Sequence, residues 1–156
     1  MKTRQPLTTA ASERAARSSA ADLDATVMQA LVTAGALVAL SDGQVLAVER
    51  DELVDFIDGQ AFAPSIPRHK IMELFCERVR KLDERYSPQL IMESFRPLAG
   101  LSLASIVVRV AHRVAAADGK IRPGEVRAIE LIRSVMAIAS AKRRQHVAPG
   151  LNYQFH

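Results

Sequence analysis

Acidic residues recur in one short pattern that the chain carries twice. In each copy an apolar run ends at an Asp-Gly pair, an aliphatic residue follows two positions after the glycine, and a glutamate lies seven positions after the aspartate. Carboxylates at a fixed spacing beside a turn can bind a hard metal ion, or they can serve only as local hydrogen-bond acceptors. The residues concerned are Asp42, Gly43, Val45 and Glu49 in the first copy and Asp118, Gly119, Ile121 and Glu125 in the second.

The spacing matches the second half of an EF-hand calcium loop. The first half is missing, because apolar residues occupy its first and third positions. Calcium takes about six to eight oxygen ligands, so a loop that lacks two of its usual carboxylates does not form a complete EF-hand. The apolar residues are Val38 and Leu40 in the first copy and Val114 and Ala116 in the second.

Both acidic positions also have a purely structural explanation. An aspartate beside glycine in a tight turn accepts a hydrogen bond from a nearby backbone N–H. A glutamate in the first turn of a helix is favoured by the helix dipole. Metal binding and a structural turn therefore both remain open from the sequence.

Apolar residues recur at helical spacing through most of the chain and predict six helices joined by short loops. The two Asp-Gly pairs separate the first helix from the second and the fifth from the sixth, so the chain contains an internal pseudo-repeat. We predict an all-α, single-domain bundle over residues 22–140, with a flexible tail at 1–21 and a loose basic tail at 141–156. The predicted helices cover about residues 22–40, 47–58, 67–82, 88–97, 103–117 and 123–139.

Composition agrees with a helical core. Hydrophobic residues make up 49% of the 156 residues and aromatic residues only 4%, with no tryptophan. A β-sandwich would require more aromatic and β-branched residues. The single cysteine, Cys76, excludes an internal disulfide and fits a reducing compartment.

Charge is distributed unevenly along the chain. Residues 22–60 contain eight acids and only one basic residue, Arg50, whereas residues 61–156 are strongly basic. We expect an acidic face on the second helix that contributes to a metal or partner surface. Basic residues are not interleaved with aromatic ones, so no nucleic-acid partner is expected. The acidic face comprises Glu49, Asp51, Glu52 and Asp55.

Two segments are relevant to whether the protein contacts a membrane. No charged residue occurs from Ala25 to Ser41, and we interpret this stretch as a buried central helix rather than a transmembrane segment. The run from Lys142 to Arg144 can contact anionic lipid or an acidic partner, or can simply complement the dipole at a helix end. We expect a cytoplasmic protein that can also lie at the surface of the inner membrane, and we expect it to have protein partners. The sequence does not determine its oligomeric state.

The Ala-rich helix that ends in Ala-Asp-Gly, followed by an aliphatic residue and a helix beginning near Pro-x-Glu, resembles the TerB (tellurite-resistance) family. Residues 116–125 carry the resemblance and residues 40–49 carry a weaker copy, within a similar region of about residues 24–138. The resemblance implies an all-helical bundle of two similar halves. It also implies a bacterial, non-enzymatic protein linked to tellurite resistance and stress tolerance.

The same resemblance implies a divalent metal such as calcium, held by Asp42, Glu49, Asp118 and Glu125. A related domain belongs to a membrane-anchored DnaJ-type co-chaperone, so the alternative is a scaffold that docks to a membrane protein or chaperone without metal. The family often has a serine before the proline of the second helix. Here Leu46 and Arg122 occupy these places, and neither offers a side-chain oxygen for capping.

Other candidate residues have a local explanation. His69, Glu73 and Cys76 share one helix face and could bind zinc, or they form a surface His–Glu pair beside a buried, inert thiol. His112 lies near two arginines in the sequence. It could bind an anion together with them, or it could lie on a solvated helix face. The sequence has no glycine-rich phosphate loop, nucleophile elbow or H-E-x-x-H helix, so we expect no enzyme activity.

Overall fold

The computed structural model describes residues 8–61 and 66–147. Over this part of the chain it has six α-helices, one short 3-10 helix and no strand, which confirms the predicted all-α fold. The elements are α1 (Thr8–Ala39), α2 (Ala47–Asp58), α3 (Arg68–Glu84), α4 (Pro88–Phe95), η1 (Arg96–Leu98), α5 (Ala104–Ala115) and α6 (Pro123–Val147).

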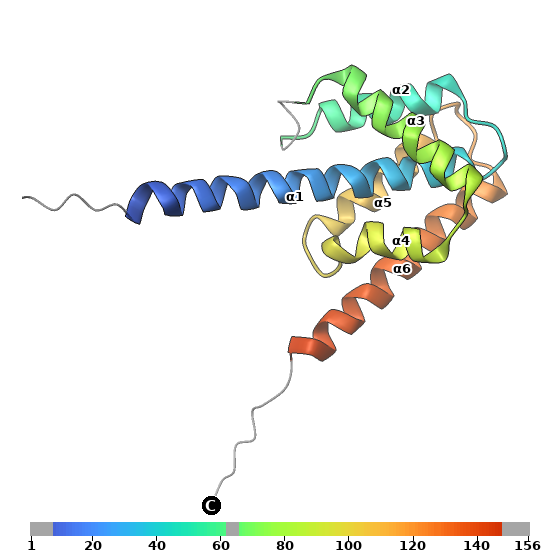
Figure 1. Ribbon diagram of the computed structural model, residues 1–156. Coiled ribbons are helices and arrows are strands. Elements are labelled where there is room, and N and C mark those ends of the chain that lie inside the picture. Colours follow the sequence, from blue (N-terminus) through green and yellow to red (C-terminus); the bar gives the residue numbers. More distant parts are fainter. Residues whose placement is uncertain (1–7, 62–65, 148–156) are drawn as a thin grey trace, which may run out of the picture.

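Helix α1 is the centre of the bundle and packs against all five other α-helices (Figure 1). Almost every residue from Val27 to Ala39 is buried, as predicted for an uncharged central helix. Ala10–Ala39 is also long and apolar enough, by length and composition alone, to cross a membrane, but 65% of its most apolar window is buried inside the protein. Burial of this kind also occurs in the core helices of soluble proteins.

The surrounding helices each contribute an apolar stripe to the core on α1. Large side chains that are fully buried come from several of them: Phe75 from α3, Phe95 from α4, Val110 from α5 and Ile132 from α6. Burying side chains of this size contributes about 1.5–3 kcal/mol each to folding. The core therefore fixes the ends of α1 and α5, where the two Asp-Gly pairs lie.

Two helices are longer than predicted. Helix α1 begins at Thr8 rather than near Asp22, and α6 continues to Val147 rather than ending near Ala139. Both extra segments project beyond the bundle (Figure 1), where apolar periodicity carries no signal because there is no core to face. The high helix propensity of alanine explains the extension of α1. Its exposed Glu13 and Arg17 also form an i,i+4 ion pair, 4.0 Å apart.

The α1–α2 and α5–α6 junctions meet in space although they are far apart in sequence. Gly124, at the start of α6, lies directly against the backbone of Ser41, at the end of α1. A Cβ atom added at Gly124 would be only 2.7 Å from the Ser41 carbonyl oxygen. The contact requires glycine, and it brings the two copies of the acidic pattern together.

Candidate functional site

The two Asp-Gly turns have the same backbone conformation. Gly43 has φ 82° and Gly119 has φ 80°, a left-handed region that side chains with a Cβ rarely adopt. The N–H of each glycine donates to a carbonyl three residues earlier at 3.0 Å, Gly43 to Leu40 and Gly119 to Ala116. The glycine in each copy of the pattern therefore serves to reverse the chain at the end of a helix.

The aspartates close the turns in the same way. The Gln44 N–H donates to Asp42 Oδ1 at 3.1 Å, and the Lys120 N–H donates to Asp118 Oδ1 at 3.0 Å. This is the local bond expected for an aspartate beside glycine. One oxygen of each aspartate is therefore used by the turn, and the other is available to a different partner.

The glutamates cap the helices that follow. The Leu46 N–H donates to Glu49 Oε2 at 2.8 Å, and the Arg122 N–H donates to Glu125 Oε2 at 2.6 Å. Each bond satisfies a backbone donor that the start of a helix leaves without a partner. Glu49 and Glu125 are only 1% exposed, so these bonds also hold two carboxylates inside the protein.

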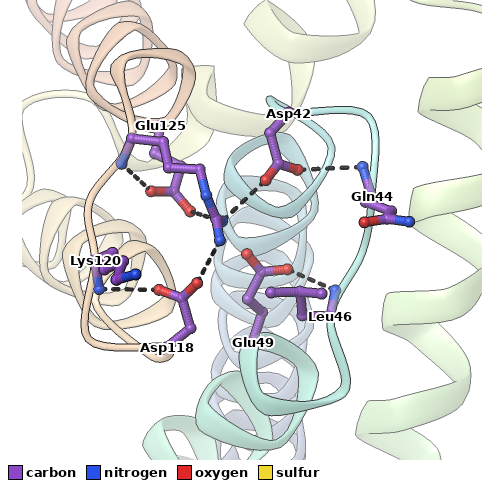
Figure 2. Close-up of polar contacts among 8 residues, drawn as sticks. Asp42, Gln44, Leu46, Glu49, Asp118, Lys120 and Glu125 are labelled. Atoms are coloured by element: carbon purple, nitrogen blue, oxygen red, sulfur yellow. Dashed lines mark hydrogen bonds and ion pairs between the residues drawn. The ribbon is translucent and has the colours of Figure 1, made fainter.

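The four carboxylates face one another across the two junctions. Figure 2 shows Asp42 and Glu49 on one side and Asp118 and Glu125 on the other, turned toward a common centre. We call these four residues the acidic centre. The structure thus brings together all four site residues that the sequence identified.

The guanidinium of Arg122 lies within the acidic centre. Its Nη1 is 2.9 Å from Asp42 Oδ2 and 3.8 Å from Glu125 Oε1, and its Nη2 is 2.6 Å from Asp118 Oδ2. The bond to Asp42 joins the second half of the pseudo-repeat to the first. Because Leu46 occupies the equivalent place in the first half, the acidic centre contains only one such cation.

Two carboxyl groups of the acidic centre, those of Glu49 and Asp118, have pKa values shifted in opposite directions. Burial raises the pKa of Glu49 to about 7; the Leu46 N–H opposes this, while the charges of Asp42, Glu125 and Asp118 add to it. The pKa of Asp118 is lowered, mainly by the Lys120 N–H and further by Arg122. The folded protein therefore disfavours the ionised form of Glu49, first by burial and then by the nearby carboxylates, and favours the ionised form of Asp118.

One buried oxygen in the acidic centre accepts no hydrogen bond. Glu125 Oε1 is inaccessible to solvent and has no hydrogen-bond partner, and the same is true of the Ser41 hydroxyl. Orphaned polar atoms of this kind are costly unless a ligand or water satisfies them. The acidic centre thus has unused capacity for a donor or a cation.

The acidic centre fits a divalent metal in chemistry but not in its present spacing. Carboxylate oxygens are the ligands that calcium prefers. Across residues 8–61 and 66–147, however, no three His, Cys, Asp or Glu side chains are grouped closely enough to hold a metal ion. Arg122 sets the present spacing, because its guanidinium occupies the space between Asp42 and Asp118.

The expected acidic face of α2 is largely neutralised by partners within the chain. Glu52 pairs with Arg113 of α5 at 2.5 Å, Asp55 with Arg68 of α3 at 2.5 Å, and Asp51 with its neighbour Arg50 at 2.8 Å. Glu49 does not lie on this face at all, since it is buried in the acidic centre. Net charge by segment could not show this, because two of the three balancing arginines, Arg68 and Arg113, come from other helices.

The remaining candidates are exposed. His69, Glu73 and Cys76 lie on the surface of α3, where Glu73 pairs with Lys70 at 3.0 Å. The expectation of a buried thiol was wrong: Cys76 is exposed because it lies one residue beyond the buried Phe75, about 100° around the helix. His112 is exposed too, with its Nε2 2.9 Å from Arg133 Nη2, as expected of a solvated face.

The fold and the site define an all-α bundle whose two similar halves meet at paired acidic helix junctions. The chain belongs to the TerB family: the model of the family described as tellurite resistance protein TerB matches residues 28–147. The resemblance found in the sequence is thereby confirmed, and a tellurite-resistance-associated function is supported at the level of the family. Comparisons with curated proteins and with solved structures gave no match.

Proposed function

We propose that this TerB-family protein acts by binding rather than by catalysis, and that its acidic centre binds a divalent cation of the calcium type. The supporting observation is the orientation of the four carboxylates. One oxygen of each accepts a backbone N–H, and the second oxygen of each faces the centre, where Arg122 now pairs with three of the four. These second oxygens are Asp42 Oδ2, Glu49 Oε1, Asp118 Oδ2 and Glu125 Oε1.

Electrostatics favours a doubly charged ligand. With all groups ionised, four carboxylates and one guanidinium leave an excess of negative charge in a partly buried space. Burial is the largest cause of the raised pKa of Glu49, and the charges of Asp42, Glu125 and Asp118 add to it. A divalent cation would relieve this repulsion more fully than Arg122 does, because it carries twice the charge and needs no hydrogen-bond geometry.

The expected affinity is weak. Four protein oxygens would leave two to four calcium ligands to water, and binding would require the acidic centre to rearrange around Arg122. We therefore expect a dissociation constant on the order of 10⁻⁴–10⁻³ M, as in low-affinity calcium modules.

Calorimetric titration with calcium of the native chain and of an Asp42→Asn, Asp118→Asn double variant tests the proposal. Asparagine keeps the side-chain oxygen that accepts the turn N–H but removes the charge, so binding should be lost while the fold is retained. The matched control is Glu93→Gln with Glu130→Gln, which removes two exposed charges elsewhere on the bundle. Equal binding by the double variant and the native chain would contradict the proposal.

Exposed aliphatic side chains beside the junctions favour a second candidate, a scaffold that docks to a membrane protein or chaperone. Val45 and Ile121 occupy the same position in each copy of the pattern, and they are 37% and 51% exposed. Exposed apolar side chains can contribute to protein interfaces. In a cross-linking experiment on membrane fractions, Val45→Ser with Ile121→Ser should abolish capture of such a partner, whereas Asp42→Asn with Asp118→Asn should not. The opposite result would exclude docking through these residues.

A further inference from the structure

Arg122 is placed where a bound cation would be. We infer that Arg122 is an internal competitor that excludes the divalent cation from the acidic centre and so sets the cation concentration at which the protein responds. The inference rests on the proposed cation binding and adds its regulation. It is carried by the position of the guanidinium between Asp42 of one half and Asp118 of the other.

The guanidinium and a metal ion would need the same atoms. Arg122 contacts Asp42 Oδ2, Asp118 Oδ2 and Glu125 Oε1, and these are the oxygens that the backbone N–H groups leave unused. A guanidinium and a divalent cation also repel each other at such distances. The acidic centre can therefore hold one or the other, but not both.

Release of Arg122 from the acidic centre requires only a movement of its own side chain. The Arg122 side chain is 37% exposed, so it can turn toward solvent without opening the core. Its backbone N–H would still bond Glu125, and the other three carboxylates would keep their own N–H donors. The bonds from the backbone N–H groups to the carboxylates would thus be kept while Arg122 leaves and the free oxygens close around the ion. The released side chain would regain rotamer freedom.

The second half of the pseudo-repeat alone carries this competitor. Leu46, at the equivalent place before α2, has an apolar side chain that cannot pair with a carboxylate. Loss of Arg122 would therefore leave the acidic centre without a resident cation. A chain with a neutral residue at this position should take up a divalent cation at lower concentration.

Calcium titration of the native chain, Arg122→Gln and the control Arg127→Gln tests the inference. Arg127 lies on the first turns of α6 and makes none of the contacts of the acidic centre, so the control removes the same charge nearby. We expect Arg122→Gln to bind calcium about tenfold more tightly than the native chain, within the range typical of coupled equilibria. Arg127→Gln should bind like the native chain.

The outcomes separate this inference from the proposed function. Equal affinity of Arg122→Gln and the native chain, or weaker binding by the variant, would overturn the competitor role and leave cation binding intact. Absence of binding in every chain would overturn both. If Arg122→Gln fails to fold, the NMR signal of the Arg122 Nε–H in the native chain provides the test. We expect calcium to shift this signal toward the position of a solvent-exposed arginine. An unchanged signal at saturating calcium would refute the inference.

Discussion

The free energy of unfolding should fall by about 2 kcal/mol between pH 5 and pH 8 because of Glu49 alone. The pKa of this carboxyl is about 7 in the folded protein, against an ordinary value of 4.5, and burial is the largest cause. A folded-state pKa above the unfolded value means that the protonated form is stabilised by folding. Its contribution is complete below pH 4.5 and is lost as the pH rises to about 7 and above.

Denaturant unfolding at a series of pH values measures this effect. Glu49→Gln keeps an oxygen for the Leu46 N–H but cannot ionise, so its stability should not show this fall. Asp51→Asn, on the exposed side of the same helix, is the control and should follow the native curve. The lowered pKa of Asp118 has the opposite effect, because its contribution to the free energy of unfolding is lost as the pH falls. The native chain and Glu49→Gln are therefore best compared above pH 5. Parallel curves for the native chain and Glu49→Gln would contradict the account.

Gly124→Ala should destabilise the protein by about 1–3 kcal/mol, the usual cost of overpacking. The new methyl group would lie 2.7 Å from the Ser41 carbonyl oxygen and 3.2 Å from its carbon. These are backbone atoms, so they can move only if α6 moves away from the end of α1. That movement would also lengthen the bond between Arg122 and Asp42, which spans the same gap.

Gly59→Ala provides a matched control for this substitution. Gly59 lies at the end of α2 with φ −78°, and a Cβ there would meet its nearest atom at 3.5 Å, an ordinary contact. Thermal unfolding of both variants should therefore show a clear loss of stability only for Gly124→Ala. Equal stability of the two variants would mean that the junctions are not held together at Gly124.

Local chemistry explains which features could be predicted from the sequence. The Asp-Gly turns and the helix-capping glutamates depend on residues within a few positions of each other, and the structure reproduces them in both copies. Helix α2 begins and ends as predicted, at Ala47 and Asp58, because an apolar stripe and flanking turn residues define it. The solvent-exposed ends of α1 and α6 lack such a stripe, and the sequence placed them less well.

Features that depend on the meeting of the two halves could not be predicted. The pair between Arg122 and Asp42 joins residues 80 positions apart. The burial of Glu49, placed on an exposed acidic face by helical periodicity, likewise depends on how the two halves pack. One signal did point to Arg122, namely a basic residue at a capping position where the family often has serine. It marked an unusual position without showing that the side chain fills the acidic centre.

The most direct test of the account is a calcium titration of the native chain followed by backbone amide NMR. The amides of Leu46 and Arg122, which donate to Glu49 and Glu125, report on both halves of the acidic centre. We expect both signals to shift together at millimolar calcium, with the Arg122 side-chain signal moving in the same concentration range. Unchanged amide signals at millimolar calcium would contradict the account, and the acidic centre would then be a structural joint closed by Arg122.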